Sequence, residues 1–370
     1  MRRQQCTMRV QRLVHQGVRA GLADLPKLQG SAGICPWMTD AAAVSAPMQP
    51  CGRDDAGWLV LFATCLAVAS LQLADPFHVV LRDLLIPAGF AVLLAAVATF
   101  YRTARPDPKI VAMTVGLQQM TMFSAVGAML SYMMAALGSD PADAWLAGWD
   151  HALGFDWVQY LHWINAHPAV AAPLQLAYES LMPQMVALIV VLGLGERLDA
   201  LRTAILGAML AGLATILISG ALPAFDAYVH FGLTPADYPN LHPSASFVHM
   251  KDVLGLRDGS LRTLSLTTMQ GIITFPSYHS ALAIVFGWGF SRASLWYVRW
   301  PGMTFAAMTL FATPIDGGHY LSDVLAGCAI AAISLWIASR AIHVDLRRRT
   351  ARGEHIRSSP SRHSHAASAR

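Results

Sequence analysis

The amino-acid sequence predicts an all-α protein, a polytopic integral membrane bundle of about eight transmembrane helices. Hydrophobic residues make up 55% of the chain and charged residues only 13%, whereas soluble domains carry about 25% charged residues. Long apolar runs recur along the chain, and the basic residues gather between alternate runs. Because so apolar a chain cannot cover a water-facing surface with polar groups, the composition argues against a soluble enzyme, a disordered protein or a disulfide scaffold.

Eight apolar segments are candidate spans, since a membrane helix needs about 20 mostly apolar residues. They cover residues 57–74, 84–101, 110–137, 170–194, 202–222, 277–290, 301–315 and 320–342. The sixth and seventh are short and need their flanking residues to cross a bilayer. The basic residues support them, because with eight spans every large basic group lies on the side of the two termini.

Lys and Arg are concentrated before the first span, after the last one, and in the connections around Arg102, Arg197 and Arg292. Under the positive-inside rule these segments face the cytoplasm. The connection at 138–167 holds four Asp and no Lys or Arg, as expected on the opposite side. We therefore expect an integral cell (inner) membrane protein whose N- and C-termini are cytoplasmic. Basic residues sorted by membrane side give no sign of nucleic-acid binding.

The segments outside the spans carry further expectations. Residues 1–56 are basic, without a long apolar run, and are expected to form a flexible cytoplasmic arm. Residues 343–370 are rich in Ser, Arg and His and are expected to form a disordered basic cytoplasmic tail. Residues 157–166 are expected to form an amphipathic helix at the membrane interface. The five Cys have no paired spacing and are expected to be free thiols.

Two polar clusters stand at the ends of predicted spans, where polar groups near hydrocarbon are costly and therefore informative. The first, at 275–280, reads Phe-Pro-Ser-Tyr-His-Ser and opens the sixth span. The second, at 316–323, reads Asp-Gly-Gly-His-Tyr-Leu-Ser-Asp and joins the seventh span to the eighth. The predicted topology places both clusters on the non-cytoplasmic side, so we expect one site there.

The residue types in these clusters favour phosphoryl transfer over acyl transfer. His319 and Asp323 are four residues apart, so at a helix start they share one face. A carboxylate on one ring nitrogen leaves the other as a directed lone pair, which suits a nucleophile or a general base. Pro276 suits a first helical turn, which places Ser277 and the following amides at an anion-binding helix start. His279, one turn further, can protonate a leaving oxygen.

Other interpretations stay open on the residues alone. The two His and the Asp could bind a metal, as in a metal-dependent membrane hydrolase, although HExxH and CxxC spacings are absent. They could also form a polar relay in a membrane transporter. Either cluster alone could merely cap its helix, an interpretation that two clusters on one side make weaker.

At these residues the chain resembles the type 2 phosphatidic acid phosphatase superfamily of membrane enzymes. Residues 275–279 are similar to its second motif, usually PSGH. Gly318-His319-Tyr320 with Asp323 and Gly327 is similar to its third, SRxxxxxHxxxD with a trailing Gly. The forms FPSxH and HYxxDxxxG are more similar to the branch of inositol phosphorylceramide synthases and other inositolphosphotransferases. Further similarity to that branch lies at Asp150, 153–157 and 178–180.

The resemblance implies a six-helix phosphatase-type catalytic domain at 110–342, preceded by two additional transmembrane helices at 57–109. It implies a reaction without metal or cofactor, in which His319 attacks phosphorus and forms a phosphohistidine while Asp323 orients and stabilises it. His279 would protonate the leaving alcohol and then deprotonate the acceptor, and Ser277 would hold the phosphoryl oxygens.

The implied enzyme is a lipid phosphatase or a phospholipid head-group (inositolphosphate-type) transferase, active at the extracytoplasmic face. Its substrate would be a lipid phosphate or a phospholipid in the bilayer, and its acceptor water or an alcohol. Two departures concern the phosphate-binding cations. The Ser and Arg of the third motif align with Ala312 and Thr313, and the first motif, Lys-x6-Arg-Pro, has no clean match. We expect the phosphate-binding cations to be Lys251, Arg257 and Arg262.

Overall fold

The computed structural model describes residues 55–241, 243 and 249–357. The arm predicted at 1–56 lies outside this range except for its last two residues. The tail predicted at 343–370 is described as far as Arg357, the residue at which helix α14 ends, and whether the tail is disordered stays a prediction. No proline interrupts residues 343–357, and Ala, Leu and Arg are strong helix formers.

The described chain is all-α apart from one pair of two-residue strands, which confirms the predicted fold class. The strands are β1 (His78–Val79) and β2 (Thr263–Leu264), paired in parallel. The helices are α2 (Asp55–Ala74), η2 (Leu81–Leu84), α3 (Leu85–Thr103), α4 (Pro108–Ala136), α5 (Asp143–Ala152), α6 (Trp157–Asn165), α7 (Pro168–Glu179), α8 (Leu181–Leu194), α9 (Leu198–Ala221), α10 (Ala227–His230), η3 (Pro235–Asp237), α11 (Met250–Asp258), α12 (Tyr278–Ser291), α13 (Trp296–Asp316) and α14 (Leu321–Arg357).

Fewer helices qualify as membrane spans than the eight that the sequence predicts. In the described chain, five segments are long and apolar enough: α2, η2 with α3, α4, α9 and the first part of α14. The pair α7 and α8 passes as a sixth. Helix α12 has only 14 residues, from Tyr278 to Ser291, and is too short to qualify. Helix α13 has 21 residues but is not apolar enough by the same measure.

The fourth predicted span, at 170–194, is broken in the structure. Helices α7 and α8 meet at an angle of 64°, with Ser180 as the hinge between them. Pro173 inside α7 and Pro183 in the first turn of α8 each remove a backbone donor. The bend turns α7 away from the axis of α8 and brings its last residues over the ends of α12 and α13.

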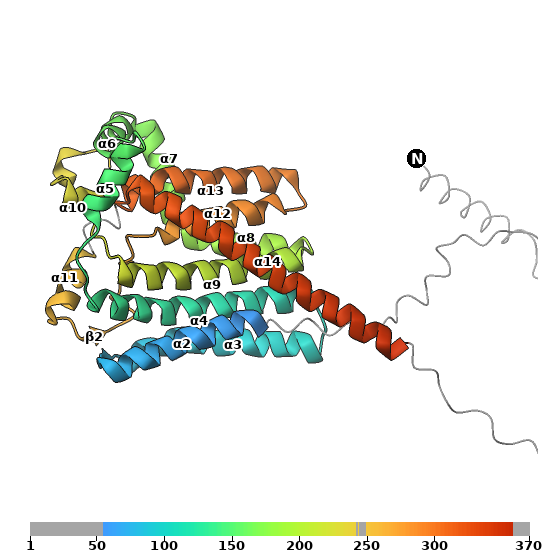
Figure 1. Ribbon diagram of the computed structural model, residues 1–370. Coiled ribbons are helices and arrows are strands. Elements are labelled where there is room, and N and C mark those ends of the chain that lie inside the picture. The colour runs from blue at the N-terminus through green and yellow to red at the C-terminus, as the bar shows by residue number, and fades with distance from the viewer. Residues whose placement is uncertain (1–54, 242, 244–248, 358–370) are drawn as a thin grey trace, which may run out of the picture. The chain divides into compact units, whose positions relative to one another are not determined.

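The bundle has two chemically different ends (Figure 1). The connections that carry Arg102, Arg197 and Arg292 lie at one end. The short helices α5, α6, α10 and α11 gather at the other, where α13 ends and both α12 and α14 begin. This arrangement agrees with the charge sorting in the sequence, whereas the side of the membrane on which each end lies stays a prediction.

Apolar side chains fill the interior between α4, α8, α9 and α12, including Phe123, Leu188, Ile205 and Phe286. A second apolar cluster under α5, α6 and α7 includes Trp157 and Leu161 and holds the short helices on the bundle end. The predicted helix at 157–166 is confirmed as α6.

The segment at 262–274, here called the strap, crosses from α11 toward α12 and is tied to the α2–α3 connection. The backbone amides of His78 and Val80 donate to the carbonyl oxygens of Arg262 and Leu264, at 2.8 and 2.9 Å. Arg262 also forms an ion pair with Asp75. The strap therefore leads into the Phe275-Pro276 motif while its other end is fixed to the first two helices.

Candidate active site

The loop between α13 and α14 presents His319 to the interior of the bundle end. Its ring Nδ1 lies 3.3 Å from Asp323 Oδ2, and the same oxygen accepts the backbone amide of Tyr320 at 3.0 Å. His319 and Asp323 are both buried. The i, i+4 pairing predicted from the sequence is therefore present, with the carboxylate fixing both the ring and the backbone next to it.

Backbone geometry holds this loop in one position. Gly318 adopts a φ of +63°, a left-handed conformation that favours glycine. A Cβ on Gly317 would lie 2.6 Å from His319 Cδ2, so only glycine lets the ring approach this closely. The carbonyl oxygen of His319 accepts the indole Nε1–H of Trp157 at 2.9 Å. Trp157 is thus buried beneath the loop instead of lying at a membrane interface.

Two carboxylates of α5 anchor the start of α14. Asp150 accepts the amides of Leu321 and Ser322 at 2.7 and 2.8 Å. These are free amides at the positive end of the helix dipole, where a carboxylate is stabilising. Asp143 accepts the hydroxyl of Tyr320 at 3.0 Å. Both carboxylates therefore support His319 from behind rather than facing a substrate.

The second histidine lies opposite the first. His279 stands in the first turn of α12, and its ring stacks on Tyr178 with centroids 4.4 Å apart and planes inclined by 12°. The centroids of the His279 and His319 rings are 6.4 Å apart. The structure therefore brings together the three predicted catalytic residues, and Tyr178 at the end of α7 sets the orientation of His279.

Ser277 joins the two motifs but does not line the cavity beside them. Its hydroxyl oxygen accepts the amide of Ser280 at 3.3 Å and caps α12. Its own amide donates to the carbonyl oxygen of Asp323 at 3.2 Å. A Cβ on Gly327 would lie 2.2 Å from the Ser277 carbonyl oxygen, so glycine is required for this contact between α14 and α12.

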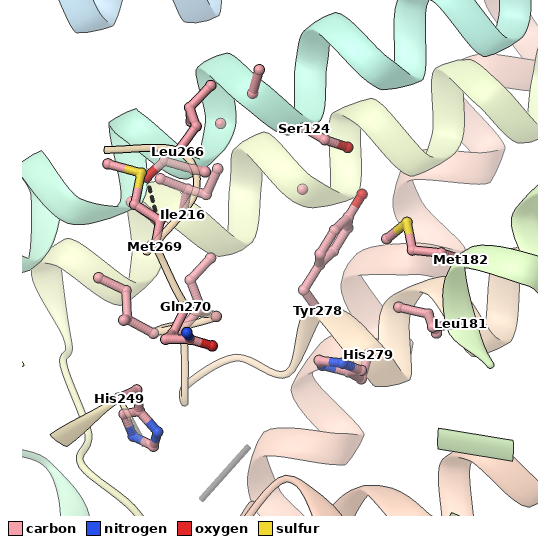
Figure 2. Close-up of a pocket in the computed structure, with 18 of the residues that line it drawn as sticks. Ser124, Leu181, Met182, Ile216, His249, Leu266, Met269, Gln270, Tyr278 and His279 are labelled. Carbon is pink, nitrogen blue, oxygen red and sulfur yellow. Dashed lines mark hydrogen bonds between the residues drawn. The ribbon is translucent and has the colours of Figure 1, made fainter. Parts of the chain in front are cut away.

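A cavity of about 780 Å³ opens beside His279 and His319. Figure 2 shows His279 and His249 at this cavity. His279, His319 and Gly317 line one part of it, together with Tyr178 and Glu179. His249, whose ring nitrogen Nε2 lies 3.1 Å from the Phe225 carbonyl oxygen, also lines it. The remaining wall is mainly apolar and comes from α3, α4, α8, α9 and the strap.

The three predicted phosphate-binding cations do not line this cavity. Lys251 is exposed on α11. The guanidinium of Arg257 donates to the Ser139 carbonyl oxygen at 3.0 Å and lies over a phenyl ring. Arg262, at the start of the strap, forms its ion pair with Asp75 of the α2–α3 connection. Among the described lining residues the charged side chains are Asp83 and Glu179, and both are acidic. In this structure Lys251, Arg257 and Arg262 therefore do not form a cationic clamp at the cavity, and their role in binding phosphate stays a prediction.

The environment of His319 bears on its protonation. Burial lowers the pKa of His319 below its ordinary value, and the neighbouring His279 acts in the same direction. The ring is therefore neutral at pH 7, the form that has a lone pair to donate. The described part of the chain contains no group of three or more His, Cys, Asp or Glu placed to hold a metal ion.

Several residues around the site were not among the predicted site residues. For Tyr178 and Glu179, the similarity of residues 178–180 to the transferase branch is the one feature of the sequence that points to a place in the site. His249 lies in a long connection with two other His, and nothing in its spacing distinguishes it. Asp143 is one of four Asp in its connection, and only the fold shows which of them face the loop of His319.

Comparison with known proteins agrees with this geometry. A family model described as PAP2 superfamily matches residues 144–337, just over half of the chain. The matched segment contains both histidine motifs, Asp150, Tyr178 and the whole of α12 and α13. No curated protein and no solved structure matches the chain. The chain belongs to the PAP2 superfamily.

Proposed function

We propose that this protein cleaves or transfers a phosphoryl group on a lipid phosphate or a phospholipid head group, with His319 as the nucleophile. The observation that carries the proposal is the hydrogen bond between His319 and Asp323, facing His279 across the end of a cavity. Membership of the superfamily supports a phosphatase or phosphotransferase activity in a membrane protein.

In the first step, the Nδ1–H of His319 donates to Asp323, which leaves the lone pair of Nε2 available. Nε2 attacks phosphorus, and a phosphorus–nitrogen bond forms as the bond from phosphorus to the leaving oxygen breaks. Protonated His279 donates its proton to that oxygen, so the alcohol leaves neutral. Asp323 stabilises the positive charge that develops on the His319 ring.

In the second step, neutral His279 takes a proton from the acceptor, which is water or an alcohol. The acceptor oxygen attacks phosphorus, the phosphorus–nitrogen bond breaks, and His319 regains its lone pair. His279 is protonated again, so the cycle closes without a net change in either histidine. Water as acceptor makes the enzyme a phosphatase, and an alcohol makes it a head-group transferase.

The charge of the cavity wall favours the transferase. A phosphate monoester is close to a dianion at pH 7, and the described lining residues offer no Lys or Arg to neutralise it. A phospholipid diester carries a single negative charge and needs less compensation. The exposed carboxylate of Glu179 can also accept hydrogen bonds from hydroxyl groups of a polyol head group or acceptor. An inositolphosphate-type transfer fits these requirements.

The proposed location is a cell (inner) membrane with the site at the extracytoplasmic face. The support is the position of both histidine motifs at the bundle end opposite Arg102, Arg197 and Arg292. By the positive-inside rule the basic end stays in the cytoplasm.

The decisive experiment supplies purified protein in detergent with a chelator and two kinds of donor, with His319→Ala as the matched variant. Lipid phosphate monoesters alone test hydrolysis, and labelled phospholipid with added alcohols tests transfer. Product from the wild type but not from His319→Ala supports the proposal. Label trapped on the protein in an acid-sensitive, base-stable form identifies the phosphohistidine.

Other outcomes identify the competing functions. Turnover that the chelator abolishes indicates a metal-dependent hydrolase. Equal turnover by wild type and His319→Ala removes the nucleophile assignment. Solute flux through reconstituted vesicles, without any phosphoryl product, indicates a transporter that uses the histidines as a polar relay.

A further inference from the structure

The part of the cavity remote from the histidines has no role in the reaction proposed above. Helix α4 forms one wall with small residues spaced three or four apart, and this spacing puts them on one face. They are Thr121, Ser124, Ala125, Ala128 and Ser131. Larger apolar residues of α9 and the strap, including Ile216, Leu266 and Met269, form other parts of the wall (Figure 2). The side chains at these five positions are short, and Phe123 of the same helix also lines the cavity.

The cavity reaches the outer surface of the bundle between α3 and α8. Ile86 of α3 and Met182 of α8 line the cavity, yet they are 76% and 58% exposed. Both belong to segments that qualify as membrane spans. Large apolar side chains exposed at the start of such segments suit contact with lipid, so a lipid chain can reach the opening that they flank.

The strap closes the cavity on another side, and the first two helices hold it there. Asp83 of η2 accepts the hydroxyls of Ser265 and Thr267, in addition to the strand pairing and the ion pair described above. Asp83 itself lines the cavity, as do strap residues from Leu266 to Thr274. The α2–α3 connection therefore positions a wall of the cavity and the segment that enters the His279 motif.

Part of the wall of this space precedes the segment that matches the superfamily, and the rest, from α8, α9 and the strap, lies within it. The match begins at residue 144, after α2, α3 and α4. The histidine motifs lie within the match, whereas the small residues of α4, the opening residue of α3 and the anchor of the strap lie before it. The histidine motifs thus lie within the matched segment, whereas the α3 and α4 part of the remote cavity wall lies outside it.

We propose that α4, the α2–α3 hairpin and the strap form a chain-selecting chamber, which takes a hydrophobic chain of the lipid substrate through the opening between Ile86 and Met182. The proposal rests on the proposed function. An acyl or similar chain is the occupant that fits an apolar wall, an opening toward lipid and continuity with the two histidines. The residues of α4 select among lipid chains, because a larger side chain on this wall reduces the length or number of chains that fit.

The first test fills the chamber. Ala128→Phe adds an aromatic ring to the α4 wall, and Ala329→Phe, on an exposed position of α14, is the matched control. Turnover is measured with a long-chain donor and with a short-chain, water-soluble donor of the same head group. We expect kcat/KM of Ala128→Phe to fall by about tenfold or more on the long-chain donor relative to the short-chain one. An equal loss on both donors, or no loss, overturns the proposal.

The second test does not depend on turnover or on a bulky variant. Ser124→Cys places a thiol on the same wall, in a background whose native Cys are replaced by Ser. A long-chain phospholipid added in detergent should slow maleimide labelling of this Cys, and a short-chain analogue should not. The same protection is expected when His319→Ala is added, since binding of the chain needs no chemistry.

The two failures are distinguishable. If lipid protects the Cys at position 124 from maleimide but no turnover is found, the proposed function is wrong and the chamber is still a lipid-chain site. If long-chain donors are turned over but do not protect the Cys at position 124, the chamber proposal is wrong and the proposed function still stands.

Discussion

One carboxylate oxygen of Asp323 holds both the ring of His319 and the amide of Tyr320, at 3.3 and 3.0 Å. At the scale of single residues, the site therefore depends on a group that does not touch the substrate. Removing its charge leaves a hydrogen-bond acceptor in place but takes away stabilisation of the positive ring that forms during attack.

Asp323→Asn should lower kcat by about 10²–10⁴-fold while the protein still folds. Steady-state kinetics with a labelled lipid donor measures the effect. Asp156→Asn is the matched control, because Asp156 only caps α6 through the amide of Gln159 and its replacement should leave kcat unchanged. A fully active Asp323→Asn protein would mean that the ring needs no ionised partner.

The acid limb of the pH profile tests the environment of His319. Burial lowers the pKa of this ring, so the ring stays neutral, and nucleophilic, to a pH below the ordinary value of about 6.5. The acid limb of kcat/KM should therefore lie below pH 6.5, with activity lost as pH falls through the lowered pKa. A midpoint at or above pH 6.5 would contradict the effect of burial.

Sequence patterns predicted that His319 and Asp323 lie together because a helix start fixes neighbours four apart, and this holds whatever the rest of the fold does; their catalytic role stays a prediction. Sequence patterns also assigned Lys251, Arg257 and Arg262 to the site, but none of the three lines the cavity. A charge in a long connection does not reveal in which direction its side chain points. Arg257, for example, is held by the Ser139 carbonyl oxygen and a phenyl ring, contacts that only the folded chain creates.

At the scale of elements, the contact between α12 and α14 brings the two motifs together. The Ser277 amide donates to the Asp323 carbonyl oxygen, and the closeness of Gly327 leaves no room for a side chain between the helices. The distance between the histidines therefore depends on the packing of α14 against α12 as well as on the loop that carries His319.

Gly327→Ala should push α14 away from α12 and cost roughly 1–3 kcal/mol, the usual cost of overpacking. We expect a lower Tm in detergent together with a loss of kcat. Gly148→Ala is the matched control: a Cβ added to this helical glycine of α5 would meet nothing within 4 Å, and alanine should stabilise the helix slightly. If Gly327→Ala retains both Tm and activity, the tight contact is not required.

Elements were predicted well where hydropathy alone decides, as in α2, α3, α4 and α9. The bend between α7 and α8 was missed because hydropathy continues across Ser180, and only the flanking Pro residues hint at a break. Helix α6 was predicted, but the buried position of Trp157 was not, since an indole suits a membrane interface and a hydrogen bond to His319 equally well.

At the scale of the whole molecule, the bundle separates a basic end from an end that holds the histidines (Figure 1). Sequence reasoning reached this arrangement because charge sorting constrains every span at once. It could not assign the cavity wall to α4 and the α2–α3 hairpin, because packing between helices depends on which faces meet.

Opposite ends of the bundle should be labelled from opposite sides of the membrane. In a protein without native Cys, Gly148→Cys on α5 should react with an impermeant thiol reagent added outside whole cells or spheroplasts. Ser294→Cys, in the α12–α13 connection, should react only after permeabilisation. Labelling of both positions from one side would contradict an eight-span arrangement, and the reverse pattern would invert the proposed orientation.

The opposed imidazoles of His319 and His279 have a stereochemical consequence. In the proposed reaction His279 serves first the departing and then the arriving oxygen, so both oxygens occupy the same side of phosphorus, away from His319. Each displacement in line with the ring nitrogen inverts the phosphorus centre. Two inversions restore the original handedness, so a donor made chiral at phosphorus with sulfur or oxygen isotopes should give product with retained configuration.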